Sequence, residues 1–186
     1  MNTSIIHGSL SAIAQRDGKS LAETYMSADV IVLVDVSGSM ASKDSTGGKS
    51  RIEVASDELR NLQNSMPGKI AVIAFSDDVE FCPSGIPRFQ GCGTDLEAGL
   101  RFVKASDIPG MRFILISDGE PADPEAALRV ARTFKCKIDV IYVGPEASPT
   151  GRDFLYKLAA ATGGEGVTAD KAQALCAKVQ TLLLHS

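Results

Sequence analysis

Asp35, Ser37 and Ser39 place three oxygen-bearing side chains directly after the apolar residues 30–34. The apolar run predicts a buried strand, and side chains alternate in direction along extended backbone. All three side chains are therefore expected on one side of an extended loop that follows this strand. Carboxylate and hydroxyl oxygens in such an arrangement can hold a hard metal ion.

Two further oxygen donors follow the first group along the chain. Thr94 lies in a short glycine-containing segment, and Asp118 follows the apolar residues 112–117. A parallel sheet would bring both to the edge beyond the carboxyl ends of its strands, where open α/β sheets bind ligands. No His or Cys lies in a motif that suits zinc. The two carboxylates and three hydroxyls instead favour Mg²⁺, with Mn²⁺ or Ca²⁺ as the alternatives.

The charges of this set indicate what the ion would do. Two carboxylates formally neutralise a divalent cation, and hydroxyls add no charge, so a sixth position stays open for water or an anion. We hypothesise that a Glu or Asp of a partner protein fills this position.

Composition limits the other classes of function. The chain has 186 residues, enough for one domain with a substantial core, and a formal net charge of −4 with scattered Lys and Arg. Nucleic acid and membrane surfaces are therefore not expected as partners. Residues 1–7 do not resemble a signal peptide and no apolar run is long enough to cross a bilayer, so we expect a soluble cytoplasmic protein. The four cysteines form no paired motif and are expected to be buried thiols, with Cys92 near Thr94 as the exception.

The elements that must position these residues alternate as in an α/β sheet layered by helices. One or two helical pieces are expected up to about Met26. Strands are expected at residues 30–35, 69–75, 79–82, 112–117 and 138–143, with a short one at 165–167. Only three residues separate the second and third strands, which predicts an antiparallel hairpin, and the other strands are expected to be parallel.

Helix starts are indicated by local signals. Ser50 with Glu53 and Thr94 with Glu97 have the spacing of capping boxes, and Asp123 precedes a proline at the first helical position. Two more helices are expected to begin at Thr150 and Thr168. In this interpretation the Thr94 hydroxyl is needed either by the helix or by a metal.

The sequence resembles von Willebrand factor type A (vWA) domains with a complete metal-ion-dependent adhesion site (MIDAS). The resemblance extends from about residue 25 and rests on three motifs, Asp35-Val36-Ser37-Gly38-Ser39, Gly93-Thr94-Asp95 and Ser117-Asp118-Gly119-Glu120. It implies a doubly wound, three-layer, Rossmann-like α/β fold with strand order 3-2-1-4-5-6 and an antiparallel third strand. It divides the chain into an amino-terminal helical extension, residues 1–26, and a metal-binding domain, residues 27–186.

The resemblance also assigns roles. Ser37 and Ser39 would coordinate the metal directly, Thr94 and Asp118 would exchange between direct and water-mediated contact, and Asp35 would act through water and anchor the serines. A non-catalytic protein-interaction module is implied. In bacteria such modules often serve an AAA-type ATPase or another multiprotein assembly, so an intracellular assembly role is expected.

Three alternatives compete with this interpretation. Residues 47–50, Gly-Gly-Lys-Ser, resemble part of the P-loop of an NTPase, but the position of the first glycine is Lys43. In a metal-dependent hydrolase or phosphotransferase Asp35 could be the nucleophile, but Ser37 stands where such enzymes use an acid. Finally, Asp, Ser and Gly are ordinary turn residues, and Asp44, Asp77 and Asp78 are expected to be solvated loop charges.

Overall fold

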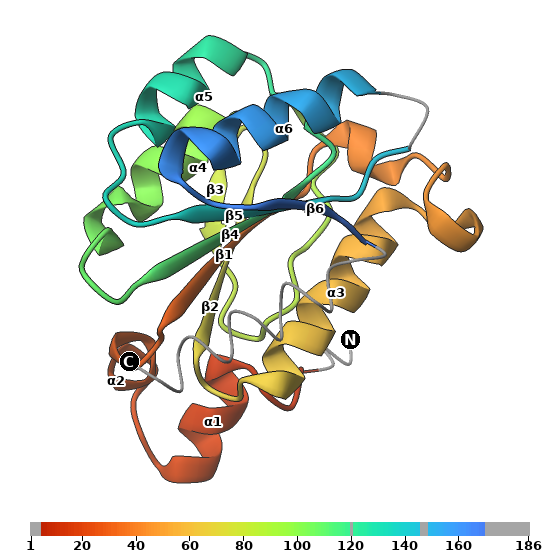
Figure 1. The fold of residues 1–186 in the computed structure, drawn as a ribbon. Helices are drawn as coiled ribbons and strands as arrows, with labels where there is room; N and C mark the ends of the chain where they lie inside the picture. Colours follow the sequence, from red (N-terminus) through yellow and green to blue (C-terminus); the bar gives the residue numbers. More distant parts are fainter. Residues whose placement is uncertain (1–4, 120, 146–148, 170–186) are drawn as a thin grey trace.

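A six-stranded sheet forms the centre of the protein, whose computed structural model describes residues 5–119, 121–145 and 149–169. The strand order is β3-β2-β1-β4-β5-β6, and every neighbouring pair is parallel except β2 and β3. Helices cover both faces, which gives three layers (Figure 1). The strands are β1 (Val30–Asp35), β2 (Ile70–Phe75), β3 (Val79–Phe81), β4 (Arg112–Ser117), β5 (Ile138–Tyr142) and β6 (Gly166–Thr168).

The central strands are apolar on both faces because each face packs against helices. β1 and β2 are buried along their whole length. Alternate residues serve two cores: Ile31 and Leu33 face one, and Val32 and Val34 face the other. This two-sided burial explains the continuous apolar runs in the sequence. The pairing of the strands confirms the expected parallel sheet.

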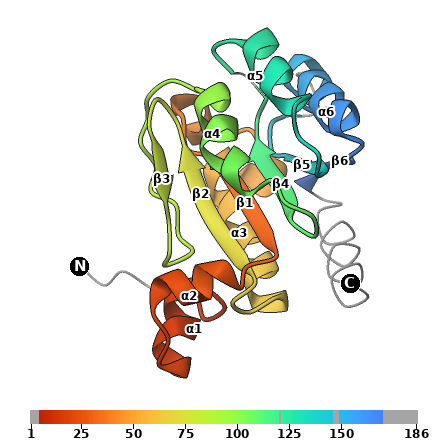
Figure 2. The same cartoon turned by 90° about the vertical axis from the view of Figure 1, so that its left-hand side faces the viewer.

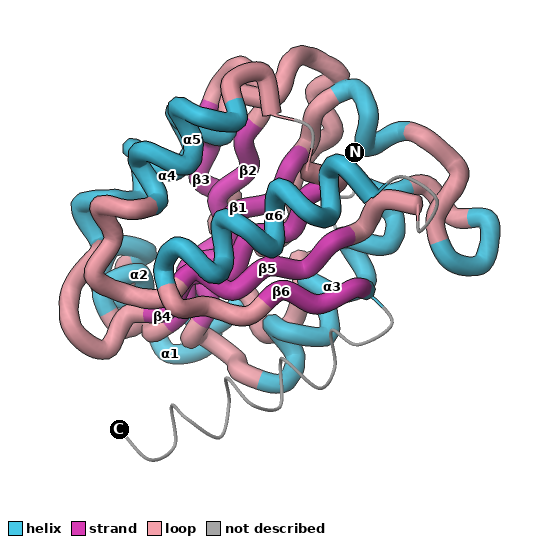
Figure 3. The backbone as a smooth tube through the Cα atoms, turned by 45° about the horizontal axis from the view of Figure 1, so that its top comes forward, coloured by secondary structure: helices cyan, strands magenta, loops and turns pink. Residues whose placement is uncertain are grey.

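Within residues 30–119, 121–145 and 149–169, three helices cover one face of the sheet and one long helix covers the other (Figures 1 and 2). α4 (Leu96–Val103), α5 (Pro124–Ala131) and α6 (Pro149–Thr162) pack on the first face, and α3 (Arg51–Ser65) packs on the second. α6 lies over β5 and β6 in the tube view (Figure 3). Short 3-10 turns are η1 (Gly38–Ala41), η2 (Thr46–Gly48) and η3 (Lys104–Ser106).

Two short helices, α1 (Leu10–Asp17) and α2 (Leu21–Met26), precede β1 and lie near its amino end (Figure 2). The backbone of this extension bonds to the rest of the chain: Ser11 N donates to Pro83 O at 2.9 Å, and Gly68 N donates to Gly8 O at 2.9 Å. At Gly8 a Cβ atom would lie 1.9 Å from the Gln63 carbonyl oxygen, so only glycine allows this close approach. The expected amino-terminal helical pieces are thus confirmed.

The predicted element boundaries agree with the structure to within one residue for the strands. The capping box at Ser50 and the cap at Asp123 both form. The helix expected from Thr150 begins at Pro149. The last expected helix lies outside the described residues, apart from Thr168, which ends β6. None of the described helices is both long enough and apolar enough to cross a membrane.

The predicted capping box at Thr94 is wrong. Asp95 caps α4 instead, and its Oδ1 accepts a hydrogen bond from Ala98 N at 2.8 Å. A carboxylate one residue later in the chain can satisfy the same free amide groups of the first turn. The Thr94 side chain is therefore not needed to begin α4.

Candidate metal site

Three loops meet beyond the carboxyl ends of β1 and β4, which are neighbours in the sheet. Gly38 N donates to Cys92 O at 2.9 Å, which joins the loop after β1 to the loop before α4. Ala122 N donates to Thr94 O at 2.9 Å, which joins that second loop to the loop after β4. The structure thus brings together the three segments that carry the predicted metal ligands.

Asp35 lies fully buried at the end of β1 and is held by two hydrogen bonds. Its Oδ1 accepts from Ser37 N at 3.0 Å, and its Oδ2 accepts from Ser117 Oγ at 2.7 Å. Burial raises the pKa of Asp35 to about 6; the hydrogen bonds from Ser37 and Ser117 oppose this shift, and the nearby Asp118 carboxylate adds to it. Through these two bonds Asp35 orients the loop after β1 and links it to the end of β4.

The two serine hydroxyls lie together, with 3.2 Å between Ser37 Oγ and Ser39 Oγ. The expected extended loop through Ser39 is wrong, because the chain turns into η1 at Gly38. Met40 in this turn is fully buried and fixes the turn against the core under α3. The turn, and not strand-like alternation, brings the serine oxygens close.

Asp118 provides the observation that bears most directly on metal binding. Its side chain is buried, Oδ2 accepts from Arg51 Nη1 at 2.7 Å, and Oδ1 has no hydrogen-bond partner among the described residues. Thr94 is also buried, and its hydroxyl makes no hydrogen bond to any residue that the structure describes. A buried carboxylate oxygen without a partner is destabilising, and a cation at this position would satisfy it. The free oxygens of Asp118 and Thr94, with the paired serines, suit a hard dication.

Comparison with known proteins agrees with the fold described above. Residues 30–84 match the family model of the von Willebrand factor type A domain, less than half of the chain. The matched segment contains Asp35, Ser37 and Ser39 and ends before Thr94. The observed strand order and the antiparallel β3 are those expected for this type of domain, in agreement with the match. The chain has a von Willebrand factor type A fold.

Solved structures with a similar fold include three from different organisms. An aerotolerance-related membrane protein from Bacteroides fragilis has a TM-score of 0.67 at 17% identity, over 84% of this chain and 98% of that one. Manganese-loaded TRAP protein from Plasmodium vivax has a TM-score of 0.57 at 19% identity, over 80% of this chain and 71% of that one. A von Willebrand factor type A protein from Catenulispora acidiphila has a TM-score of 0.58 at 16% identity, over 83% of this chain and 41% of that one. A comparison with curated protein sequences gives no significant match.

Arg51 is a residue of this vWA fold that the sequence analysis did not single out. It is the first residue of α3, its side chain is 8% exposed, and all three guanidinium nitrogens are bonded. Nη1 donates to Asp118, while Nε and Nη2 donate to the Asp44 oxygens at 2.9 and 2.8 Å. The hydrogen bonds that Arg51 donates to Asp44 and to Asp118 raise the pKa of Arg51 above its usual value, and burial of the side chain opposes this shift. Asp44 is therefore not a free loop charge, although its side chain is 41% exposed.

A sequence signal for Arg51 does exist. A cation in the first turn of a helix is disfavoured by the helix dipole, so an arginine at this position needs carboxylate partners. Nothing in the sequence indicates that Asp118, 67 residues later, is one of them.

The segment that resembles a P-loop makes helix contacts in this vWA fold. Lys49 Nζ bonds to Asp57 of α3 at 2.7 Å, and Ser50 Oγ serves the capping box with Glu53. The two glycines of this segment belong to η2, and the segment does not directly follow a strand. The described residues also contain no group of three or more His, Cys, Asp or Glu side chains placed to bind a metal.

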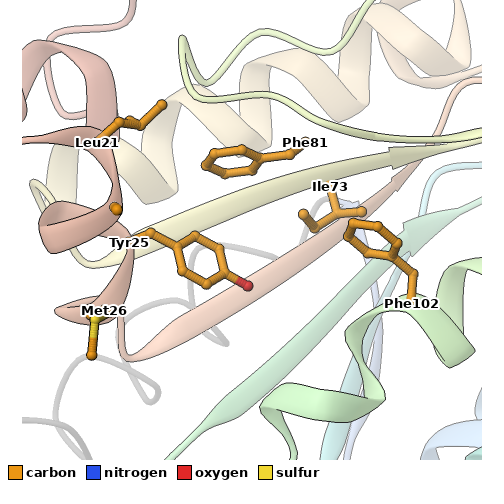
Figure 4. Close-up of a pocket in the computed structure, with 7 residues that line it drawn as sticks. Leu21, Tyr25, Met26, Ile73, Phe81 and Phe102 are labelled. Carbon is orange, nitrogen blue, oxygen red and sulfur yellow. The ribbon is translucent and has the colours of Figure 1, made fainter.

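A separate apolar pocket of about 450 Å³ lies near the amino end of β1 (Figure 4). α2, β2, β3 and α4 supply its walls, with Tyr25 and Phe81 in an edge-to-face contact at 5.3 Å between ring centroids. The residues that line this pocket in the described part of the chain include no carboxylate, unlike those of the candidate metal site.

Proposed function

We propose that this chain is a non-catalytic protein-interaction module of the vWA family that binds a divalent cation at a MIDAS. The observation that carries the proposal is the buried Oδ1 of Asp118, which has no hydrogen-bond partner among the described residues. It lies beside a loop whose Asp35, Ser37 and Ser39 fall in the segment that matches the family model. Mg²⁺ is the proposed ion, with Mn²⁺ and Ca²⁺ to be tested against it. The manganese in the related fold of the Plasmodium vivax TRAP protein supports the choice of Mn²⁺ as a probe.

Each residue of the site has a role that its contacts support. Ser37 and Ser39 would hold the ion through hydroxyls that already lie 3.2 Å apart. Thr94 would contribute its hydroxyl, and Asp118 would contribute Oδ1, which has no hydrogen-bond partner among the described residues. Asp35 would orient Ser37 through the bond to its backbone N–H. When bound, the ion would supply an electrophilic position for an anionic oxygen of another molecule.

The partner that fits such a site presents a Glu or Asp side chain. A hard carboxylate oxygen suits a magnesium-type ion, and the three neutral hydroxyls do not reduce its charge. By analogy with the family in bacteria, we propose an AAA-type ATPase or another multiprotein assembly as the partner, acting in the cytoplasm.

The first experiment is calorimetric titration of the purified protein with MnCl₂ and MgCl₂. We expect one site in the wild type and loss of binding in Asp35→Ala, with circular dichroism to confirm folding. Asp153→Asn is the matched control, because this carboxylate of α6 is 70% exposed. A wild type that binds neither ion, or an Asp35→Ala protein that binds as the wild type does, would overturn the proposal.

The second experiment tests the partner. Affinity capture with the wild type, with Asp35→Ala and with wild type in EDTA should identify proteins that are lost under both perturbations. Substitution of the acidic residues of such a protein should then abolish binding. Binding that is unchanged by EDTA would contradict a contact through the metal.

A further inference from the structure

β3 is an edge strand of the sheet, and part of its backbone faces away from β2. Cys82 N, directly after β3, donates to Val72 O at 2.8 Å. Bonded and non-bonded residues alternate in an antiparallel pair, so the N–H and C=O groups of Val79 and Phe81 point away from β2. No hydrogen bond engages these groups within the part of the chain that the structure describes. An unpaired strand edge of this kind can pair with another extended chain.

The apolar pocket of about 450 Å³ lies beside this edge, because Phe81 belongs to both. Phe81 and Tyr25 of α2 meet edge to face, which fixes one wall of the pocket (Figure 4). Met26 and Phe102, which also line the pocket, are 86% and 53% exposed. Large apolar side chains gathered around one hollow mark a surface that another apolar group can cover. In a chain paired with β3, the residue opposite Phe81 would direct its side chain to the face of the sheet on which the pocket lies.

Acidic side chains lie on the other side of this edge and in the turn before it. Glu80 stands between Val79 and Phe81, so its side chain points away from the pocket. Asp77 and Asp78 form the turn that precedes β3, and all three acidic residues are exposed. None of the three forms an ion pair with another described residue. Lys or Arg side chains of a paired strand would complement these charges.

We propose that β3 and the pocket bind an extended segment of a partner protein, in which apolar residues alternate with Lys or Arg. The segment adds a strand to the sheet at β3, its apolar side chain enters the pocket, and its basic side chains lie beside Glu80. This contact goes beyond the proposed metal site and needs no metal ion. A second copy of β3 is disfavoured as the occupant, because antiparallel pairing centred on Glu80 would set two like charges directly opposite each other.

The first test is calorimetric titration of the full chain, in EDTA, with the peptide acetyl-Lys-Leu-Lys-Val-Lys-Thr-amide. A control peptide with the order Leu-Val-Lys-Lys-Lys-Thr has the same composition and charge but no alternation. We expect the first peptide to bind at least about tenfold more tightly, because only this peptide can bury its leucine while it pairs with β3. Equal binding of the two peptides, or no binding of either, would overturn the proposal.

Methylated backbone amides in the first peptide test strand pairing directly. Alternate amides of an added strand donate to β3, and the amides between them point to solvent. Methylation of one alternate set should weaken binding by about tenfold or more, and methylation of the other set by less than about threefold. Similar effects of both sets would mean that the peptide lies in the pocket without adding a strand, which contradicts the proposal.

Two variants of the protein test the pocket and the charge. Phe102→Ser should weaken binding of the first peptide by about tenfold. Phe89→Ser is its matched control, because Phe89 is 48% exposed and lies in the loop before α4. Glu80→Lys should weaken binding by about threefold or more, while Glu125→Lys makes the same charge change on α5 and should leave binding unchanged. Controls that weaken binding as much as the pocket and edge variants do would contradict the proposal.

Analytical ultracentrifugation without peptide tests the competing occupant. We expect the wild type to sediment as a monomer. A wild-type dimer that is lost in Phe102→Ser would mean that a second copy covers the pocket, and this result would overturn the proposal. All of these measurements are made in EDTA, so their outcome is independent of whether the chain binds a divalent cation.

Discussion

Ser117 Oγ donates a hydrogen bond to Asp35 Oδ2 at 2.7 Å and so joins the carboxyl ends of two neighbouring strands. The Ser117 Oγ atom also accepts a hydrogen bond from Gly119 N at 3.0 Å. One small hydroxyl therefore fixes both the buried carboxylate of β1 and the backbone on either side of Asp118. The Ser117 hydroxyl thus links the positions of the two acidic residues of the site through two hydrogen bonds.

Replacement of Ser117 by Ala should disturb the metal site without removing any predicted ligand. Asp35 Oδ2 would lose its partner in a buried position, which should lower the free energy of unfolding by about 1–3 kcal/mol. Because Asp35 and Gly119 both lose their contact, we expect metal affinity to fall by about 10- to 100-fold. Thermal unfolding and calorimetric titration with MnCl₂ measure the two effects.

Ser42→Ala is the control for this substitution, because Ser42 is exposed and follows η1. Stability and affinity should both stay at wild-type values in the control. If Ser117→Ala lowers stability and leaves metal affinity unchanged, the contact serves the fold alone.

Thr94 and Asp95 should show opposite behaviour although they are neighbours. Asp95 caps α4, so Asp95→Ala should lower the free energy of unfolding by about 1 kcal/mol and leave metal affinity unchanged. The Thr94 hydroxyl has no role in the cap, so Thr94→Ala should weaken Mn²⁺ binding by about tenfold or more with little change in stability. Denaturant unfolding and calorimetry on the same two proteins separate the roles. Equal effects of both substitutions on both measurements would contradict this assignment.

Replacement of Met40 should lower both the stability of the fold and the affinity of the site for a metal ion. It is 0% exposed and fixes the η1 turn that contains Ser39, so Met40→Ala should lower the free energy of unfolding by about 2–5 kcal/mol. A loosened turn should also weaken Mn²⁺ binding. Met26, which is 86% exposed, provides the same chemical change at a surface position, and Met26→Ala should alter neither quantity. Measurements below the melting temperature of each variant keep the two effects apart.

Strands and their neighbours could be predicted from sequence because local signals determine them. Buried strands read as continuous apolar runs, and the three residues between Phe75 and Val79 allow only a hairpin. Helix caps at Ser50 and Asp123 are likewise indicated by residues no more than three positions away, Glu53 and Pro124. At Thr94 the local signal was ambiguous, because the next residue is an even better cap.

Contacts between distant residues could not be predicted in the same way. Arg51 and Asp118 are 67 positions apart and meet only because α3 begins beside the end of β4. Asp44 was expected to be solvated because a loop aspartate usually is, and its partner Arg51 was not recognised. The ligand residues of the site were accessible from motif spacing, but the hydrogen bonds that restrict them depend on tertiary packing.

Asp107 gives a prediction for the pH dependence of stability at a position far from the metal site. Burial alone would raise the pKa of Asp107, but hydrogen bonds from Lys104 Nζ and from the amides of Lys135 and Cys136 outweigh it and hold the pKa well below its usual value. A carboxylate with a lowered pKa in the folded state stabilises that state above the pKa of the unfolded chain, about 3.9. This contribution is lost as the pH falls below about 4.

Asp107→Asn should therefore be less stable than the wild type at pH 7, and the difference should shrink as the pH falls below about 4. Urea unfolding from pH 7 to pH 2.5 measures the difference directly. Asp153→Asn provides the exposed control, for which the difference should stay near zero throughout. A gap between wild type and Asp107→Asn that is constant over this range would mean that packing of Asp107, and not its charge, stabilises the turn after α4.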